Sequence, residues 1–397
     1  MSTQKIKVPE TWSEYNHLEV AALEDPAPVM ARLRRQNPIG HSEQFGGFYV
    51  LTNYADCTQA ARDPHFSSST ERGPGPGFPY SGVIKPISMI NDDGQRHRDF
   101  RIPIQEFFSI DASNAMAPKV REICSDLVDK FIERGEADLA TQFTMELPAI
   151  LISELLDLPQ HRRHEFQSWA SKVVATGDID LIHKLAGEID QLYDLRIQSP
   201  GEDIPSKLLR FQVDGKPISR VDWQGLVMLL VMGGLDTTAN GGALALHMIG
   251  TQPDLRKYLL EDLTRIPDAA KELIRLISPV PNHSRGVTGD VVINGHQFKK
   301  GDIVELSWIA ANRDPAVFQE PDKFIPNRKP NNHVGFGFGP HRCLGANLAM
   351  VEMNIMIDEI LSRLPDYEVI EAVRFPSINR AMSNLRVKFT PGRRLKP

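Results

Sequence analysis

The feature that most constrains the fold is a long apolar segment, residues 221–249, in a chain of 397 residues. Its middle is apolar nearly all round a helix, so a helix formed there must be buried on every side. We therefore expect other helices to surround it in one large domain, although the length alone would also fit two or three ordinary domains. Residues 226–235 are about half the length needed to cross a bilayer, and Asp236-Thr-Thr ends them. No membrane span is expected.

Hydrophobic periodicity predicts further helices and a small amount of sheet. Apolar residues at helical spacing predict helices over residues 26–36, 119–134, 143–156, 162–175, 179–197, 264–277 and 345–364. Short β-prone runs next to glycine turns predict strands over residues 41–45, 48–52, 291–293, 297–298, 303–307 and 385–389. The expected fold class is mainly α. Because the sequence shows no repeat and no linker, one domain is expected over residues 1–397. Its minor β-sheet region comes mainly from about 38–66, 287–308 and 366–390.

Composition and charge exclude several functions. The net charge is −6, so nothing attracts the chain in general to nucleic acid or to an anionic membrane. The first ten residues hold two lysines without an apolar run behind them, which is not a signal peptide. Three cysteines in so long a chain cannot form a disulfide framework. We expect a cytoplasmic protein in which any special cysteine is a ligand or a nucleophile.

One cysteine stands in a glycine-rich motif. Residues 336–345 read Phe-Gly-Phe-Gly-Pro-His-Arg-Cys-Leu-Gly, and a strongly helical run follows. Glycines let the backbone approach a flat ligand closely, and a helix start favours the thiolate form of Cys343. A buried cysteine in a loop is the alternative. From average compositions, Phe, three Gly and Cys at these offsets occur by chance in roughly one chain of this length in 10⁴, so we favour a ligand or nucleophile.

This motif resembles the haem-thiolate loop of the cytochrome P450 family at every position. Three further segments resemble family motifs in the same order: Gly233-Gly-Leu-Asp-Thr237, Glu272-Leu-Ile-Arg275 and Phe324-Ile-Pro-Asn-Arg328. Glu-x-x-Arg alone is a very weak signal, but the four together are strong. The resemblance covers roughly residues 90–390. It implies the cytochrome P450 fold and haem b (iron protoporphyrin IX) as the cofactor.

The resemblance also implies roles for individual residues. Cys343 would be the proximal iron ligand and the only protein ligand of the metal. The other residues that would contact the cofactor are His341, Arg285, His97, Arg101, Phe336 and Gly234. Among these, the two histidines and two arginines would meet the haem propionates, because a buried carboxylate needs charge-assisted donors. For His97 and Arg101 a solvated helix face is the alternative. The resemblance assigns Glu272, Arg275 and Arg328 to a buried ion network that supports the cysteine loop.

The central helix is unusual on physical grounds alone. Gly233 and Gly234 each cost about 1 kcal/mol relative to alanine inside a helix. One interpretation is a close-packing site between helices with a back-bonded threonine. The other, which the resemblance favours, is a local opening of the helix where Asp236 and Thr237 relay protons to bound O₂.

The expected partners follow from the same resemblance. Electrons would come from an iron–sulfur ferredoxin, which an NAD(P)H-dependent reductase reduces. The ferredoxin would dock near Arg98 and Arg342. The substrate would be a small to medium, largely apolar organic molecule. Its pocket would be lined by residues 78–87, Leu229, Met232, residues 280–284 and the loop near Ile378. Within residues 280–284, Asn282 and His283 have two equally supported interpretations. They contact a polar group of the substrate, or they form hydrogen bonds with local backbone groups.

Three other functions stay open at this stage. A peroxide-driven enzyme of the same fold is disfavoured by the intact pair of Asp236 and Thr237, which peroxide would make unnecessary. A haem sensor without turnover would leave the same pair idle, and no output domain is visible. A non-haem enzyme with Cys343 as nucleophile needs a base and an orienting acid. His341 lies near in sequence, but no motif supplies the rest.

Overall fold

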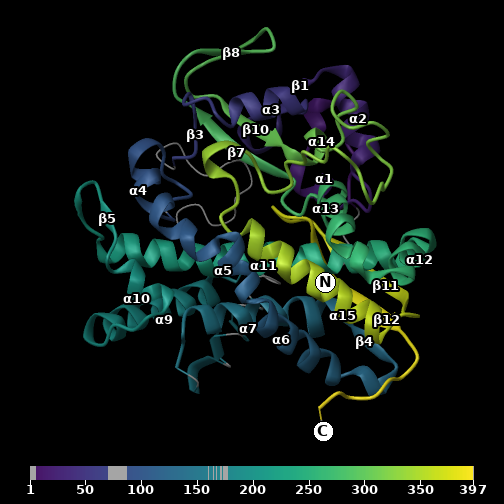
Figure 1. Ribbon diagram of the computed structural model, residues 1–397. Coiled ribbons are helices and arrows are strands. Elements are labelled where there is room, and N and C mark those ends of the chain that lie inside the picture. The colour runs from purple at the N-terminus through teal and green to yellow at the C-terminus, as the bar shows by residue number, and fades with distance from the viewer. Residues whose placement is uncertain are drawn as a thin grey trace. The chain divides into compact units, whose positions relative to one another are not determined.

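The computed structural model describes residues 6–69, 87–159, 161–163, 165–166, 168–169, 172 and 178–396. Most of residues 78–87, which are expected to line the substrate pocket, and part of the predicted helix at 162–175 therefore lie outside the described residues. Helices dominate the rest of the chain, which confirms the prediction of a mainly α protein (Figure 1). Within the ranges given above, no helix is both long and apolar enough to span a membrane.

The chain folds into two compact units. Unit 1 comprises residues 1–78, 247–343 and 372–383, and unit 2 comprises residues 79–246, 344–371 and 384–397. Three elements contribute residues to both units: α11 (Arg220–Thr251), β11 (Glu368–Phe375) and β12 (Ala381–Lys388). The assignment of residues 1–397 to one domain stays a prediction.

Unit 1 combines short helices with most of the sheet. Its helices are α1 (His17–Ala22), α2 (Ala27–Gln36), α3 (Tyr54–Ala60), α12 (Pro253–Glu261), α13 (Ile266–Ile277) and α14 (Trp308–Ala311). Its 3₁₀ turns are η1 (Trp12–Glu14), η2 (Gln44–Gly46), η7 (Leu263–Arg265) and η8 (Gly339–His341). Its strands are β1 (Ile39–Ser42), β2 (Phe48–Leu51), β3 (Phe66–Ser67), β7 (Asn282–Val287), β8 (Val291–Ile293), β9 (His296–Phe298) and β10 (Ile303–Ser307).

Five of these strands form one sheet in the order β1-β2-β10-β7-β3. Strand β10 lies parallel to β2 and antiparallel to β7, with Leu306 opposite His283 and Val304 opposite Arg285. Because side chains alternate along a strand, His283 and Arg285 share one face of β7. An apolar core that includes Val304, Leu306 and Trp308 lies against this part of the unit. The sheet thus fixes which side chains of residues 282–287 are neighbours.

Unit 2 is almost entirely helical. Its helices are α4 (Gly94–Ile104), α5 (Ile110–Ala115), α6 (Ala117–Asp129), α7 (Glu146–Leu155), α9 (Ile179–Gln198), α10 (Ile204–Leu208) and α15 (Ala346–Arg363). Its 3₁₀ turns are η4 (Gln105–Phe108) and η5 (Ile132–Arg134), and η6 (Ala140–Thr144) is a π-helical turn. Its short strands are β4 (Glu136–Asp138), β5 (Gln212–Val213) and β6 (Lys216–Pro217), and β12 pairs antiparallel with β4.

The structure corrects several sequence predictions in detail. The helix expected over 119–134 ends at Asp129, and a 3₁₀ turn leads to Gly135 at φ +73°. The first hairpin strand ends at Ser42 because the turn η2 occupies Gln44–Gly46. Strand β7 begins at Asn282, before the predicted β region, and β4, β5 and β6 lie outside all its ranges.

Burial of α11 also differs from the prediction. Residues 238–247 are buried without exception, as a helix apolar on all sides requires. The segment 232–237 is less buried, and Gly233 is exposed. The expectation that the middle of this helix is buried on every side is therefore wrong for the stretch that contains the glycine pair and the acid.

Candidate active site

The cysteine loop is folded by its own backbone. The Cys343 N–H donates to the carbonyl of Phe336 at 2.8 Å, and the Arg342 N–H donates to Gly339 at 3.1 Å. Gly337 and Gly339 adopt φ +71° and +73°, which L residues rarely adopt. A Cβ on Gly339 would lie only 2.5 Å from the carbonyl oxygen of Ala61. Gly337 and Gly339 thus suit the shape of this loop, and Gly339 also leaves room for the Ala61 carbonyl.

Cys343 is the exposed thiol of the three cysteines, while Cys57 and Cys124 are buried. Burial raises the pKa of both buried thiols well above the ordinary value. A thiolate ligand or nucleophile needs access and ready deprotonation. The structure therefore singles out the same cysteine as the motif.

Two of the predicted cofactor contacts, Arg285 and His341, lie in unit 1. Arg285 is buried on β7 and donates to the carbonyl of Ser284 at 2.8 Å. His341 lies in η8 of the cysteine loop. Both act on the same ring, that of His283. Burial, and then the charges of Arg285 and His341, lower the pKa of His283 to about 3. This part of unit 1 is rich in cationic and N–H groups.

The other two, His97 and Arg101, lie four residues apart on α4, hence on one helix face. His97 is only 4% exposed, so the alternative of a solvated face is wrong for it, whereas Arg101 is half-buried. Their neighbour Arg96 holds the start of the helix in place. It bonds to Asp92 at 3.0 Å and Asp214 at 2.6 Å, and it also pairs with Asp222.

The segment of α11 that carries Asp236 and Thr237 is a continuous helix, so the expected local opening is not seen. The Thr237 hydroxyl donates to the carbonyl of Gly233 at 2.9 Å, the back-bonded arrangement that competed with it. Asp236 Oδ1 accepts from the Asn240 amide at 2.6 Å.

The two glycines of this segment differ in their surroundings. A Cβ on Gly234 would lie 2.8 Å from Ile152 Cδ1, whereas one on Gly233 would meet nothing nearer than 4.0 Å. Close packing against α7 is thus sufficient reason for glycine at 234. The assignment of Gly234 to the cofactor stays a prediction. The exposed Gly233 was identified from sequence as unusual in a helix, but it was not assigned to the cofactor.

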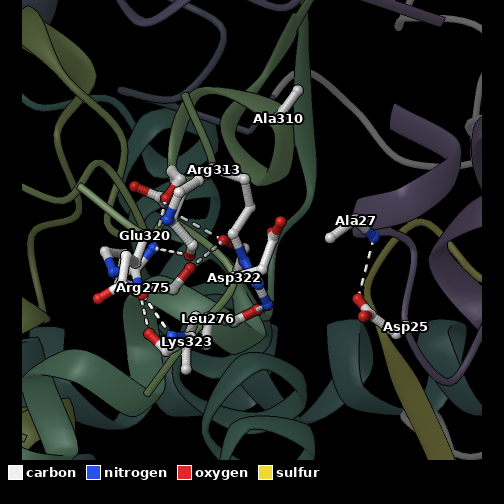
Figure 2. A network of polar contacts seen from close by, with 12 residues as sticks. Asp25, Ala27, Arg275, Leu276, Ala310, Arg313, Glu320, Asp322 and Lys323 are labelled. Atoms are coloured by element: carbon white, nitrogen blue, oxygen red, sulfur yellow. Dashed lines mark hydrogen bonds and ion pairs between the residues drawn. The ribbon is translucent and has the colours of Figure 1, made fainter. Parts of the chain in front are cut away.

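The predicted ion network is confirmed. Glu272 accepts from Arg275 at 2.7 and 2.8 Å and from Arg328 at 3.0 Å, and all three side chains are buried. Arg275 also donates to backbone carbonyls of the segment 312–323. Figure 2 shows Arg275 beside Lys323, and Arg313 between Leu276 and Asp322. Helix α13 is thereby tied to the segment that precedes the cysteine loop.

These residues fit an iron porphyrin. Such a group needs one axial protein ligand and cationic donors for two carboxylates. The exposed Cys343 would supply the first, and Arg285 and His341 would offer the second. Among the described residues, no group of three or more His, Cys, Asp and Glu side chains gathers as metal ligands.

The mainly α fold, the exposed cysteine in its glycine loop and the Glu–Arg–Arg network together define a haem-thiolate enzyme. The model of the family described as "Cytochrome P450" matches residues 118–389, and the chain belongs to that family. It is accordingly an oxidoreductase, a cytochrome P450 monooxygenase with haem b as its cofactor.

Known relatives agree along almost the whole chain. "Polyketide biosynthesis cytochrome P450 PksS" of Bacillus subtilis is 31% identical over 87% of this chain and 90% of its own length. Its solved structure has a TM-score of 0.84 and covers 92% of this chain and 97% of that one. A "Steroid C26-monooxygenase" of Mycolicibacterium smegmatis is 29% identical over 91% of this chain and 90% of its own length. P450BioI, solved in complex with a hexadec-9Z-enoic acid-ligated acyl carrier protein, is 25% identical with a TM-score of 0.84, covering 93% and 99%.

Proposed function

We propose that this enzyme uses O₂ and two externally supplied electrons to hydroxylate or otherwise oxidise a small to medium, largely apolar organic molecule. The observation that carries the proposal is the exposed Cys343 and the shape of its loop. Backbone hydrogen bonds within the loop and two glycines with positive φ maintain that shape. The names of relatives that act in polyketide biosynthesis or on steroids support a largely apolar substrate class.

Each predicted residue has a task in this proposal. When bound, the haem supplies the site at which O₂ is activated, and the Cys343 thiolate donates electron density to it. Arg285, His341, His97 and Arg101 would hold the propionates by charge-assisted hydrogen bonds. Phe336 and Gly234 complete the contacts carried over from the family motifs.

Asp236 and Thr237 handle protons. The Thr237 hydroxyl, which donates to Gly233, keeps its lone pairs available as acceptors, and it sits one residue from the Asp236 carboxylate. Thr237→Ala should consume electrons without forming product in proportion, while Thr237→Ser should keep most of the coupling. Equal coupling in wild type and Thr237→Ala would remove the relay role and favour a peroxide-driven reaction.

The experiment that tests the proposal is the absorption spectrum of the reduced protein under carbon monoxide, recorded beside Cys343→Ala. A strongly red-shifted Soret band that the variant lacks supports thiolate ligation. A band typical of histidine ligation in the wild type would overturn it. Cys57→Ala serves as the matched control, because that thiol is buried.

Members of this family need a redox partner, and we propose an acidic ferredoxin with an NAD(P)H-dependent reductase. Arg98 is exposed on α4, and Arg342 lies beside Cys343, so both are candidates for the docking site. The reduction rate should fall as salt rises, since charge pairs steer association. A rate independent of salt would contradict this. The buried free thiols Cys57 and Cys124 support a reducing, cytoplasmic location.

A further inference from the structure

His283 has a geometry that the sequence left open. It lies on β7 two residues before Arg285 and on the same face of that strand. Its Nδ1 lies 2.7 Å from Nε1 of Trp308, the first residue of α14. The bond therefore runs to a side chain 25 residues away, and not to local backbone.

This contact fixes the tautomer of His283. An indole nitrogen can only donate, so Nδ1 of His283 must accept with its lone pair. The proton of the neutral ring is then on Nε2, which becomes an N–H donor. Burial, and then the charges of Arg285 and His341, lower the pKa of the ring to about 3, so the ring is neutral near pH 7. Nε2 has no hydrogen-bond partner among the residues that the structure describes.

The charged groups that act on His283 all have the same sign. They are Arg285, from its own strand, and His341, from η8 in the cysteine loop, and no carboxylate acts on it. Glu305 of β10 pairs with Ser284 and so belongs to the other face of the sheet, where it contacts Tyr15. His283 and Arg285 thus share one face of β7, and no acidic side chain is among the groups that act on the ring.

We propose that His283, locked by Trp308, is a neutral donor that binds a carboxylate together with Arg285 and His341. The inference rests on the proposed function, within which a carboxylate has two sources: a haem propionate or an acidic substrate. His283 is a positioning residue in the first case and a specificity-determining residue in the second. A neutral donor suits a site that already holds two basic groups, since a third charge would cost desolvation and repulsion.

The test compares His283→Phe, which removes the donor, with His283→Gln, which keeps a neutral N–H. One arm measures the rate of haem loss from the ferric holoprotein to excess apomyoglobin. The other measures the dissociation constants of dodecanoate and of its methyl ester by calorimetry on the holoprotein. His65→Phe is the matched control, because His65 is an exposed histidine of the same unit that bonds to Asp63.

If the source is a propionate, His283→Phe accelerates haem loss about ten-fold or more, and His283→Gln restores most of the retention. If it is the substrate, His283→Phe weakens dodecanoate binding by a similar factor and leaves the ester unchanged. Wild-type values in both arms for His283→Phe would overturn the proposal.

Trp308→Phe gives an independent readout. Without the indole donor, the neutral ring can carry its proton on Nδ1 and not on Nε2, so the affected arm should weaken in Trp308→Phe in the same direction as in His283→Phe. Wild-type values in Trp308→Phe would contradict the lock. Every His283 variant should keep the thiolate-type carbon monoxide band, and its loss from the wild type would overturn the proposed function instead.

Discussion

At the scale of single residues, Gly337 and Gly339 form a matched pair. Both have φ near +70°, but a Cβ on Gly339 would clash with the Ala61 carbonyl, whereas one on Gly337 would meet nothing nearer than 3.9 Å. Gly337→Ala should therefore cost only about 1–2 kcal/mol of backbone strain. Gly339→Ala should cost more and lower the haem content, because a backbone atom cannot move aside cheaply. Urea unfolding and the haem-to-protein ratio measure both effects. Equal losses in the two variants would contradict this assignment.

Glu272 carries a second prediction. Burial raises its pKa, but the hydrogen bonds and charges of Arg275 and Arg328 outweigh this and hold it below the ordinary 4.5. Glu272→Gln leaves buried guanidinium groups without a counter-charge and should cost about 3–5 kcal/mol of unfolding free energy. The exposed pair of Glu261 and Arg265 is the control, and Glu261→Gln should cost less than about 1 kcal/mol.

The pH dependence of the Glu272 variant follows from the same shift. A carboxyl group whose pKa is lowered in the folded state stabilises the protein at pH values above its pKa in the unfolded state. This stability is lost as the pH falls through the folded-state pKa. The difference between wild type and Glu272→Gln should thus shrink below about pH 4.5. A difference that stays constant to pH 3 would mean that the charge of Glu272 is not what matters.

Predictability from sequence differs between these residues for a physical reason. The sequence could predict that Cys343 is the distinctive cysteine of the chain, because the glycines of its own loop, which are its neighbours in sequence, create its environment. The bond between His283 and Trp308 could not be predicted, because it depends on the register of β7 against β10. Likewise, nothing local distinguishes Gly233 from Gly234, since only the packing of α7 against α11 does so.

At the scale of elements, the packing of α7 against α11 predicts opposite changes in stability when each of the two glycines is replaced by alanine. Gly234→Ala pushes into the buried Ile152 and should destabilise the protein by roughly 1–3 kcal/mol. Gly233→Ala finds open space in a helix interior and should stabilise it by up to about 1 kcal/mol. Chemical unfolding of both variants distinguishes them. Destabilisation by Gly233→Ala would show that the helix near Gly233 does not keep the regular form described here.

Elements were predictable where periodicity is strong. Helices α2, α9, α13 and α15 lie within a few residues of their expected positions. Strand β11 was not predicted separately, because its residues are mostly exposed and lack a clear alternation. The back-bonded Thr237 shows a different limit. The motif predicts that this residue handles protons, but it does not predict the bond that its hydroxyl makes to the Gly233 carbonyl in the helix.

At the scale of the whole molecule, the half-buried His283 and His333 and the buried Glu305 and Glu352 give opposite slopes of stability against pH. Burial, followed by nearby cations, lowers the pKa of His283 to about 3 and of His333 to about 4. The contribution of these two histidines to the free energy of unfolding is lost as the pH falls below about 6.5. Burial raises the pKa of Glu305 and of Glu352 to about 8. Their contribution is complete below about 4.5 and is lost as pH rises through about 8.

Glu352 gives the clearest test of the alkaline side. It is buried on α15, its raised pKa is due to burial alone, and its Oε2 has no hydrogen-bond partner among the described residues. Glutamine at this position is neutral at every pH. Glu352→Gln should therefore match the wild type in unfolding free energy near pH 5 and exceed it at pH 9, where the wild type must bury a charge or distort.

The measurement is urea unfolding of both proteins at half-unit steps from pH 5 to pH 9. Glu305 titrates equally in wild type and variant, so the difference between the two curves isolates Glu352. Glu368→Gln, an exposed carboxylate on β11, is the control and should follow the wild type throughout. A Glu352→Gln curve parallel to the wild type would mean that water reaches this carboxyl and that the helices around it are less tightly packed than described.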